Sequence, residues 1–404
     1  MNYLVAAFTF LLSFHRHSYV GYGALILILS ISPMIKYFLG FQSLSIFYAL
    51  FIGVIILSSI NRGNEKVSQS MVLFILVLLV MLLIQQLLIG FNFALLALGL
   101  VKLTMLPLLG YFVARELHSR NKDIFSVFAI YLMVNVVIFF WRAFYDYSFF
   151  GILNATTFYG GDIGSLAYRP SNLTSPIIFG IELAMIISTM YVSNFSKWTK
   201  IFLFGVIFLI LIIIQSRAAI FVISLMLMLY LNYSKQGNWN FFIILTAVAL
   251  ISLGWFLSNE LPYIFSLLSY EGGAYDTRIS SVLVALEIFS NVSPVEFIFG
   301  VGSGLASQHA SSFGYEAIYV ENGLVSLMVE NGFLVFIFFM GALVYYPMKK
   351  GLAGICGYLY ILLLSIVFVN LFSASLTVIS VQAIFWLVYF YGLFMPTKAL
   401  KPTF

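Results

Sequence analysis

The chain consists of long apolar runs separated by short polar connections. Runs such as MVLFILVLLVMLLI at 71–84 are apolar on every face, whereas the strands of an outer-membrane barrel alternate apolar with polar residues. Because a membrane-crossing helix needs roughly 20 apolar residues, the pattern predicts an all-α polytopic membrane protein with about 12 transmembrane helices. We place the spans at 18–38, 43–60, 69–89, 92–113, 123–143, 173–193, 199–215, 218–233, 240–258, 322–347, 353–370 and 372–394.

Composition agrees with this class and excludes others. The chain has 63% hydrophobic and 8% charged residues, which rules out an ordinary soluble protein. Its net charge of +5 comes from basic residues dispersed in ones and twos, so we expect no nucleic-acid partner. The single cysteine, Cys356, excludes an internal disulfide and zinc sites built on paired cysteines. The N-terminus has no basic region before its apolar run, so we do not expect a signal peptide.

Lysine and arginine orient the spans, because short basic loops stay in the cytoplasm. One orientation places 13 of the 19 basic residues inside, with both termini cytoplasmic. Residues 1–404 then form a single integral membrane domain with two external segments at 144–172 and 258–321. These segments hold nine of the fourteen acidic residues, so we expect the working face there.

The longer external segment has two local patterns. Apolar positions at helical spacing over 279–289 predict an amphipathic helix that lies on the membrane surface. Gly300, Gly302 and Gly304 predict a flexible turn. GVGSG also matches a phosphate-binding nest, but a turn that simply needs glycine is the simpler interpretation, because no strand precedes it.

No nucleotide or metal site is predicted. The chain lacks an Asp-x-Asp pair, a Walker glycine loop, a Ser-His-Asp spacing and a histidine-rich cluster. We therefore expect neither a cofactor nor a metal ion.

Isolated arginines near the outer face are more informative. Arg169, Arg217 and Arg278 could converge as a diphosphate clamp, since planar guanidinium donors match phosphate oxygens. For each one alone, contact with lipid headgroups is the alternative, and Arg217 fits it least because it lies in a tight external turn. Arg142 is the weakest candidate for substrate binding, because Asp146 at i+4 could neutralise it on the helix surface.

Two glutamates mark the segment YVENGLVSLMVENGFLVF of the tenth span. Glu321 lies near the outer interface and is a candidate general base, with a solvated helix-cap carboxylate as the alternative. Glu330 lies nine residues deeper on the opposite helix face, so the two do not form one acid–base pair. Lys102 lies about ten residues below the same surface, and Glu182 and Glu330 lie about eight or nine below it. We therefore predict that Lys102 pairs with at least one of these carboxylates in a structural charge network.

Aromatic residues make up 18% of the chain, and core or interfacial positions account for most of them. Those in the external segments could stack on sugars. Tyr319 is one of them, and Tyr319 and His309 are candidates for substrate contact.

Several segments resemble the bacterial O-antigen polymerases (Wzy), which share a fold with the O-antigen ligases. SRAAIFVIS at 216–224 is similar to the family's Ser-Arg-small-small helix start, and RPSNLTSPIIFG resembles its arginine segment before an earlier span. TRISSVLVALEIFSNVSPVEFIFGVGSG at 277–304 resembles the Arg-to-GxG segment of its large periplasmic loop, and YVENGLVSLMVENGFLVF resembles the segment after that loop. The resemblance extends over roughly 169–338, in matching order.

The resemblance implies a GT-C-like multi-span glycosyltransferase in lipopolysaccharide biosynthesis. It would lie in a bacterial inner membrane, with the external segments and the active site in the periplasm. Its substrates would be an undecaprenyl-diphosphate-linked oligosaccharide donor and acceptor, and Arg169, Arg217 and Arg278 would bind the diphosphate. Membrane lipid and a chain-length regulator are further candidate partners. Ligases have a catalytic histidine where this chain has Glu321, and this difference favours a polymerase.

Two alternatives stay open. One is an O-antigen ligase that transfers glycan to a lipid A core or a protein. The other is a transporter or flippase of the lipid-linked oligosaccharide. A transporter predicts broken helices, inverted repeats and charged residues along a path from both faces, and the sequence indicates none of these.

Overall fold

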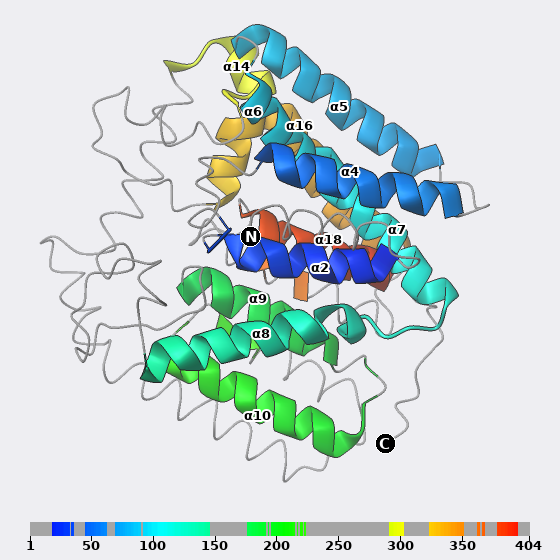
Figure 1. Ribbon diagram of the computed structural model, residues 1–404. Helices are drawn as coiled ribbons and strands as arrows, with labels where there is room; N and C mark the ends of the chain where they lie inside the picture. Colours follow the sequence, from blue (N-terminus) through cyan, green and yellow to red (C-terminus); the bar gives the residue numbers. More distant parts are fainter. Residues whose placement is uncertain are drawn as a thin grey trace, which may run out of the picture.

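A computed structural model describes the larger part of the chain as a bundle of helices (Figure 1). The described residues are 18–32, 34–35, 45–62, 69–89, 92–145, 176–190, 193, 195–214, 216, 219–220, 222–223, 291–302, 323–350, 362–363, 366–367 and 378–394. They contain helices and no strand, so the predicted all-α class is confirmed for this part of the chain.

The described helices follow the apolar runs. They are α2 (Ser18–Ser30), α4 (Ser45–Arg62), α5 (Gln69–Ile89), α6 (Phe93–Gly99), the π-helical η1 (Leu100–Met105), α7 (Leu106–Ser119), α8 (Phe125–Phe144), α9 (Pro176–Met190), α10 (Lys197–Ile214), α14 (Pro294–Phe299), α16 (Gly323–Lys350) and α18 (Ile379–Phe394). The predicted spans at 218–233, 240–258 and 353–370 lie wholly or largely outside the described residues, as does the predicted surface helix at 279–289.

Several helices suit a membrane by length and composition. Four candidate spans occur among the described residues, at Met71–Leu88, Leu95–Ser119, Phe125–Phe144 and Gly323–Ala342. On α5, Leu73 and Leu87 are 62% and 81% exposed. A long helix that exposes apolar side chains in this way has a surface suited to lipid.

Helices α18 and α9 form the centre of the bundle. In Figure 1, α18 lies between a group formed by α4 to α7 and a group formed by α8 to α10, and it packs on both α7 and α9. Tyr111 of α7 makes edge contacts with Phe390 and Phe394 of α18, with ring centroids 5.6 and 5.3 Å apart. In α9, the hydrophobic side chains from Ile181 to Ile187 are fully buried, as expected for a helix that is apolar on all faces.

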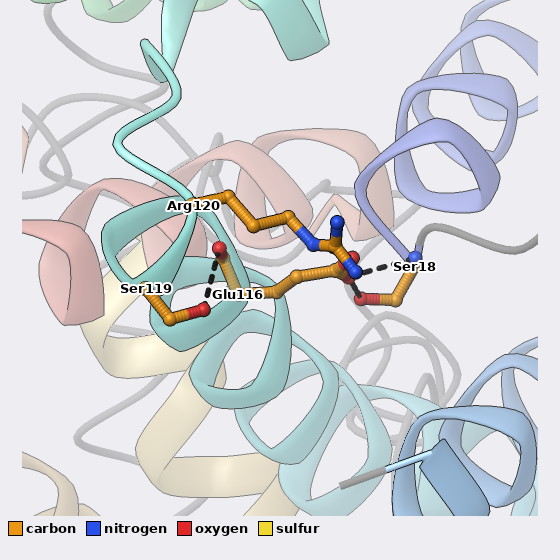
Figure 2. Close-up of polar contacts among 4 residues, drawn as sticks. All are labelled: Ser18, Glu116, Ser119 and Arg120. Carbon is orange, nitrogen blue, oxygen red and sulfur yellow. Dashed lines mark hydrogen bonds and ion pairs between the residues drawn. The ribbon is translucent and has the colours of Figure 1, made fainter.

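A carboxylate joins α2 to the end of α7 (Figure 2). Glu116 accepts hydrogen bonds from the backbone N–H of Ser18, at 2.8 Å, and from its hydroxyl. Its other oxygen pairs with Nε of Arg120 at 3.0 Å. A negative charge at the first residue of α2 stabilises the unpaired N–H groups there. Arg115 and Lys122 lie near the same end, which we call the basic end of the bundle.

α16 is broken within its length. Gly332 has φ 84° and ψ 162°, so regular helix stops before it and resumes after it. The sequence predicts an unbroken span at 322–347 and no broken helices, and this is wrong for α16. The letters Val-Glu-Asn-Gly occur twice, at 320–323 and 329–332. The first copy ends where α16 begins, and the second ends at the break.

The chain segment that follows α14 pairs with the break. A helix that stops leaves the carbonyls of its last turn without helical donors. Here the N–H groups of Val301 and Gly302 donate to the carbonyls of Val329 and Glu330, both at 3.0 Å. The segment thus replaces hydrogen bonds that α16 loses at Gly332.

We call the pairing of the segment after α14 with the break in α16 the crossing. A side chain of α5 also bonds to it. Nε2 of the buried Gln85 donates to the carbonyl of Glu330 at 2.6 Å and to that of Phe299, the last residue of α14, at 2.7 Å. Gly300 and Gly302 have φ of 85° and 116°, so the predicted need for glycine is confirmed at both. The predicted flexibility is wrong, because both residues are buried and backbone-bonded, and Gly304 lies outside the described residues.

Replacing Gly332 by alanine should destabilise the protein. The new Cβ would lie 2.2 Å from the carbonyl oxygen of Ile298 and 2.5 Å from the nitrogen of Gly300, and its φ suits only glycine. We expect the free energy of unfolding to fall by at least about 2 kcal/mol, measured on purified protein in detergent. Gly341→Ala in the same helix is the matched control, because no atom lies within 4 Å of its added Cβ. Equal stability of the two variants would contradict the described crossing.

Candidate functional site

A buried ion pair lies beside the break in α16. Nζ of Lys102 is 3.8 Å from Oε2 of Glu330, and the two side chains are 11% and 9% exposed. The predicted pairing of Lys102 with one of the two carboxylates is therefore present. Because an isolated ammonium inside an apolar bundle is costly, each charge stabilises the other there.

The ion pair joins two irregular stretches of helix. Lys102 lies in η1, a six-residue π-helical stretch between α6 and α7. Pro107 follows within the first turn of α7, and a proline removes one backbone donor and crowds the carbonyl four residues earlier. This steric effect accounts for the wider turns of η1. Short π-helical stretches often occur at functional sites.

Glu182 belongs to a different polar cluster from Lys102. Its side chain is fully buried, and Oε2 accepts a hydrogen bond of 2.5 Å from the hydroxyl of Tyr131. Asn135, one turn further along α8, donates to the hydroxyl of Ser30 at 3.0 Å and to the carbonyl of Tyr131 at 2.9 Å. Within the described part of the chain, the predicted network is thus divided into the Lys102–Glu330 ion pair and a hydrogen-bonded cluster around Glu182.

Arg142 is buried in the last turn of α8, away from the basic end of the bundle. Only 5% of the residue is exposed, although the sequence places it on the helix surface. That prediction is wrong because Arg142 falls on the same face of α8 as Tyr131 and Asn135, which packs inward. One turn earlier, Phe139 contacts Phe179 of α9 with ring centroids 6.1 Å apart. Arg142 therefore lies close to where α9 begins.

Near the same end, α9 makes a close contact with Ser216, which follows α10. A Cβ added to Gly180 of α9 would lie 2.6 Å from Cβ and 2.3 Å from Oγ of Ser216. α9 begins seven residues after Arg169, and Ser216 directly precedes Arg217. The structure thus brings α9, which follows Arg169 in the sequence, against the residue that precedes Arg217, while both arginines lie outside the described residues. We call the region of Arg142, Gly180 and Ser216 the arginine end of the bundle.

Most of the predicted site residues lie outside the described residues. This applies to Arg169, Arg217, Arg278, Glu321, Tyr319 and His309, and to Asp146, the predicted partner of Arg142. The described chain comes within two residues of Glu321, at Gly323, where α16 begins. In the described ranges, no group of three or more His, Cys, Asp or Glu residues could hold a metal ion.

Sequence reasoning missed several residues that shape this region. Gln85 is one, although a pair of glutamines inside the apolar run at 69–89 indicates a buried polar contact. Gly180 is another, and its signal is the spacing of small residues at 180, 184 and 188 on one face of α9. Tyr131 could be paired with Glu182 only from the packing of α8 against α9.

No protein-family model matches the chain, and no curated protein matches it. A functional interpretation therefore depends on the chemistry of the residues, on the resemblance of short motifs and on the geometry above.

Removing one member of the buried ion pair should destabilise the protein more than removing both. Glu330→Gln leaves the Lys102 ammonium without its counter-charge, and we expect a loss of about 3 kcal/mol in the free energy of unfolding. The double variant Lys102→Met/Glu330→Gln carries neither charge and should lose less than Glu330→Gln alone. Thermal or denaturant unfolding in detergent measures the free energy of unfolding of each variant. A loss in the double variant equal to the sum of the single losses would show that the two charges do not interact.

Proposed function

We propose that this chain is a bacterial O-antigen polymerase, a GT-C-like glycosyltransferase of the inner membrane. It would join undecaprenyl-diphosphate-linked repeat units on the periplasmic face and release undecaprenyl diphosphate. The observation that carries the proposal is the contact between Gly180 and Ser216. It joins the helix that follows the Arg169 motif in the sequence to the residue before Arg217, and so supports a diphosphate site that uses both motifs.

The proposed reaction is an inverting glycosyl transfer. A hydroxyl oxygen of the acceptor sugar attacks the anomeric carbon of the donor, and the bond from that carbon to the diphosphate oxygen breaks. Arg169, Arg217 and Arg278 would stabilise the negative charge on the departing diphosphate. Glu321 would accept the proton of the attacking hydroxyl. The reaction as written needs neither a nucleotide nor a metal ion.

The two ends of the bundle support the proposed orientation. Arg115, Arg120 and Lys122 gather at the basic end, which the positive-inside trend assigns to the cytoplasm. Arg142, at the arginine end, is buried instead of reaching towards headgroups. A buried guanidinium near the proposed diphosphate site would add to its positive potential.

A flippase for the same lipid-linked oligosaccharide is the second candidate. The break in α16 favours it, because discontinuous helices with charges beside the break are common in transporters. An O-antigen ligase is the third, and it would need a lipid A core or protein acceptor.

One reconstitution separates these functions. Purified protein in proteoliposomes receives a synthetic lipid-linked repeat unit as the only glycan. A polymerase makes a ladder of longer lipid-linked glycans. A flippase moves the repeat unit across the bilayer and forms no new linkage. Lectin accessibility of the glycan measures this movement. A ligase makes product only when its acceptor is added. Absence of a ladder from active, folded protein would overturn the polymerase proposal.

Arg217 should be needed for chemistry and dispensable for folding. Arg217→Ala removes one charge-stabilising donor, and we expect polymerisation to slow by roughly 100-fold or more. Arg217→Lys should recover little activity, because the bidentate geometry is lost. The ladder assay measures the rate, and size-exclusion chromatography checks folding. A well-folded Arg217→Ala protein that makes a normal ladder would refute this role.

Glu321 should be needed for turnover more than for binding. Glu321→Gln keeps the size of the side chain and removes its charge, so the variant should bind lipid-linked substrate normally. We expect it to polymerise at least roughly 100-fold more slowly, the lower range for loss of a general base. Glu321→His should keep part of the activity, as the resemblance to ligases implies. Near-normal turnover of Glu321→Gln would show that this carboxylate serves only as a helix cap.

A further inference from the structure

Helix α14 exposes apolar side chains, although it belongs to the predicted external segment 258–321. Val295 and Ile298 are 43% and 38% exposed. The helix has a polar beginning, where the hydroxyl of Ser293 accepts a hydrogen bond from the N–H of Glu296 and the carboxylate of Glu296 accepts one from the N–H of Ser293. Single exposed apolar side chains are normal in any protein, so the surroundings of α14 decide what covers these two.

The two helices that α14 contacts have surfaces suited to lipid. In Figure 1, α14 lies beside one end of α5 and packs against α16. At that end of α5, Leu87 and Leu88 are 81% and 50% exposed. Phe333 of α16 is 40% exposed and stacks on Phe297 of α14, with ring centroids 5.3 Å apart, and Ile337 one turn further along α16 is 52% exposed. Because α5 and α16 both contain candidate membrane spans, lipid is the expected neighbour of these side chains.

Hydrogen bonds from Gln85 fix the depth of the end of α14. Gln85 lies three residues before Leu88, the last residue of the candidate span in α5, which is about 5 Å along the helix axis. Its side chain donates to the carbonyl of Phe299, the last residue of α14. It also donates to the carbonyl of Glu330, which lies seven residues, or about 10 Å, inside the candidate span that begins at Gly323. Both counts place the end of α14 inside the apolar layer defined by the two spans.

The chain around α14 meets the requirement that a membrane places on peptide groups. Without water, their N–H and C=O groups must be bonded within the protein, and irregular backbone is tolerated only where protein buries it. The N–H groups of Phe297 and Gly300 donate to the carbonyls of Ser293 and Glu296, at 2.9 and 2.7 Å. The irregular stretch that follows, 300–302, is buried and bonds to α16 at the crossing. This arrangement suits a segment that enters a bilayer.

We propose that α14 is a re-entrant membrane segment: the end of the long external segment dips into the bilayer, where Val295 and Ile298 contact lipid acyl chains. The polar turn at Ser293 lies near the headgroups, and the chain after α14 turns at Gly300 into the buried crossing. The segment 258–321 is then external only in part, and its end is held at a fixed depth beside the break in α16. This lipid contact involves no glycan, so it is the same in a polymerase and in a flippase.

Spin labels on single cysteines test the proposal. The full-length Cys356→Ser protein is reconstituted into vesicles of phosphatidylethanolamine and phosphatidylglycerol, with one label at Ile298→Cys. Val80→Cys is the reference for lipid, because Val80 lies in the candidate span of α5 and is 44% exposed. Lys122→Cys, an exposed position at the basic end, is the reference for water. Oxygen concentrates in hydrocarbon, whereas a polar nickel chelate stays in water, so the ratio of their collision rates with the label reports its surroundings. We expect the ratio at Ile298→Cys to match that at Val80→Cys and to exceed that at Lys122→Cys several-fold.

Two more labels along the same segment give a matched series. The ratio should rise from Asn291→Cys, at the exposed polar side of α14, through Val295→Cys to Ile298→Cys. Size-exclusion chromatography checks the folding of each variant, and Val295→Cys supplies the same comparison if Ile298→Cys misfolds. A ratio at Ile298→Cys as low as that at Lys122→Cys would place α14 in water and overturn the proposal. A label that neither reagent reaches would show that protein covers Ile298 instead of lipid, and would also overturn it. The measurement requires no activity, so the absence of a ladder would overturn only the polymerase function.

Discussion

Peptide groups inside an apolar bundle must find partners within the protein, and this constraint governs how the break in α16 is built. The carbonyls of Val329 and Glu330 are satisfied by the chain after α14, and Gln85 adds a third donor at the same point. Because these partners come from distant parts of the sequence, the break ties α5, α14 and α16 together. The Lys102–Glu330 pair extends the connection to η1.

Polar groups elsewhere in the bundle also find partners within the protein, in smaller clusters of residues. Tyr131 donates to one carboxylate oxygen of Glu182, and Asn135 bonds both Ser30 and the backbone of α8. At the basic end, Glu116 serves the start of α2 and the side chain of Arg120. Each cluster joins two or more helices, so the polar residues fix which helices are neighbours, whereas the apolar residues mainly drive burial.

Hydropathy predicts the helices well, because a span of lipid requires a continuous apolar run whatever its neighbours are. Depth along a span also follows from counting residues, and it predicted that Lys102 could reach Glu330. Contacts between helices are not predicted in this way. The inward orientation of Arg142, the pairing of Tyr131 with Glu182 and the close approach at Gly180 all depend on how helices rotate and cross. The break at Gly332 was missed because Asn-Gly is a short signal inside an apolar run.

The way the break is held bears on the choice between a polymerase and a flippase. Alternating access requires one part of a transporter to rock against another, so discontinuous helices there belong to elements that move. Here Gly300 and Gly332 pack so closely that an added Cβ on either would lie within 2.5 Å of the other's backbone nitrogen. Movement at this crossing would break the two backbone hydrogen bonds of Val301 and Gly302 and strain those of Gln85, and each is costly to lose in an apolar setting. A crossing fixed in this way suits the proposed polymerase better than a carrier, because a carrier needs its discontinuous helices to move.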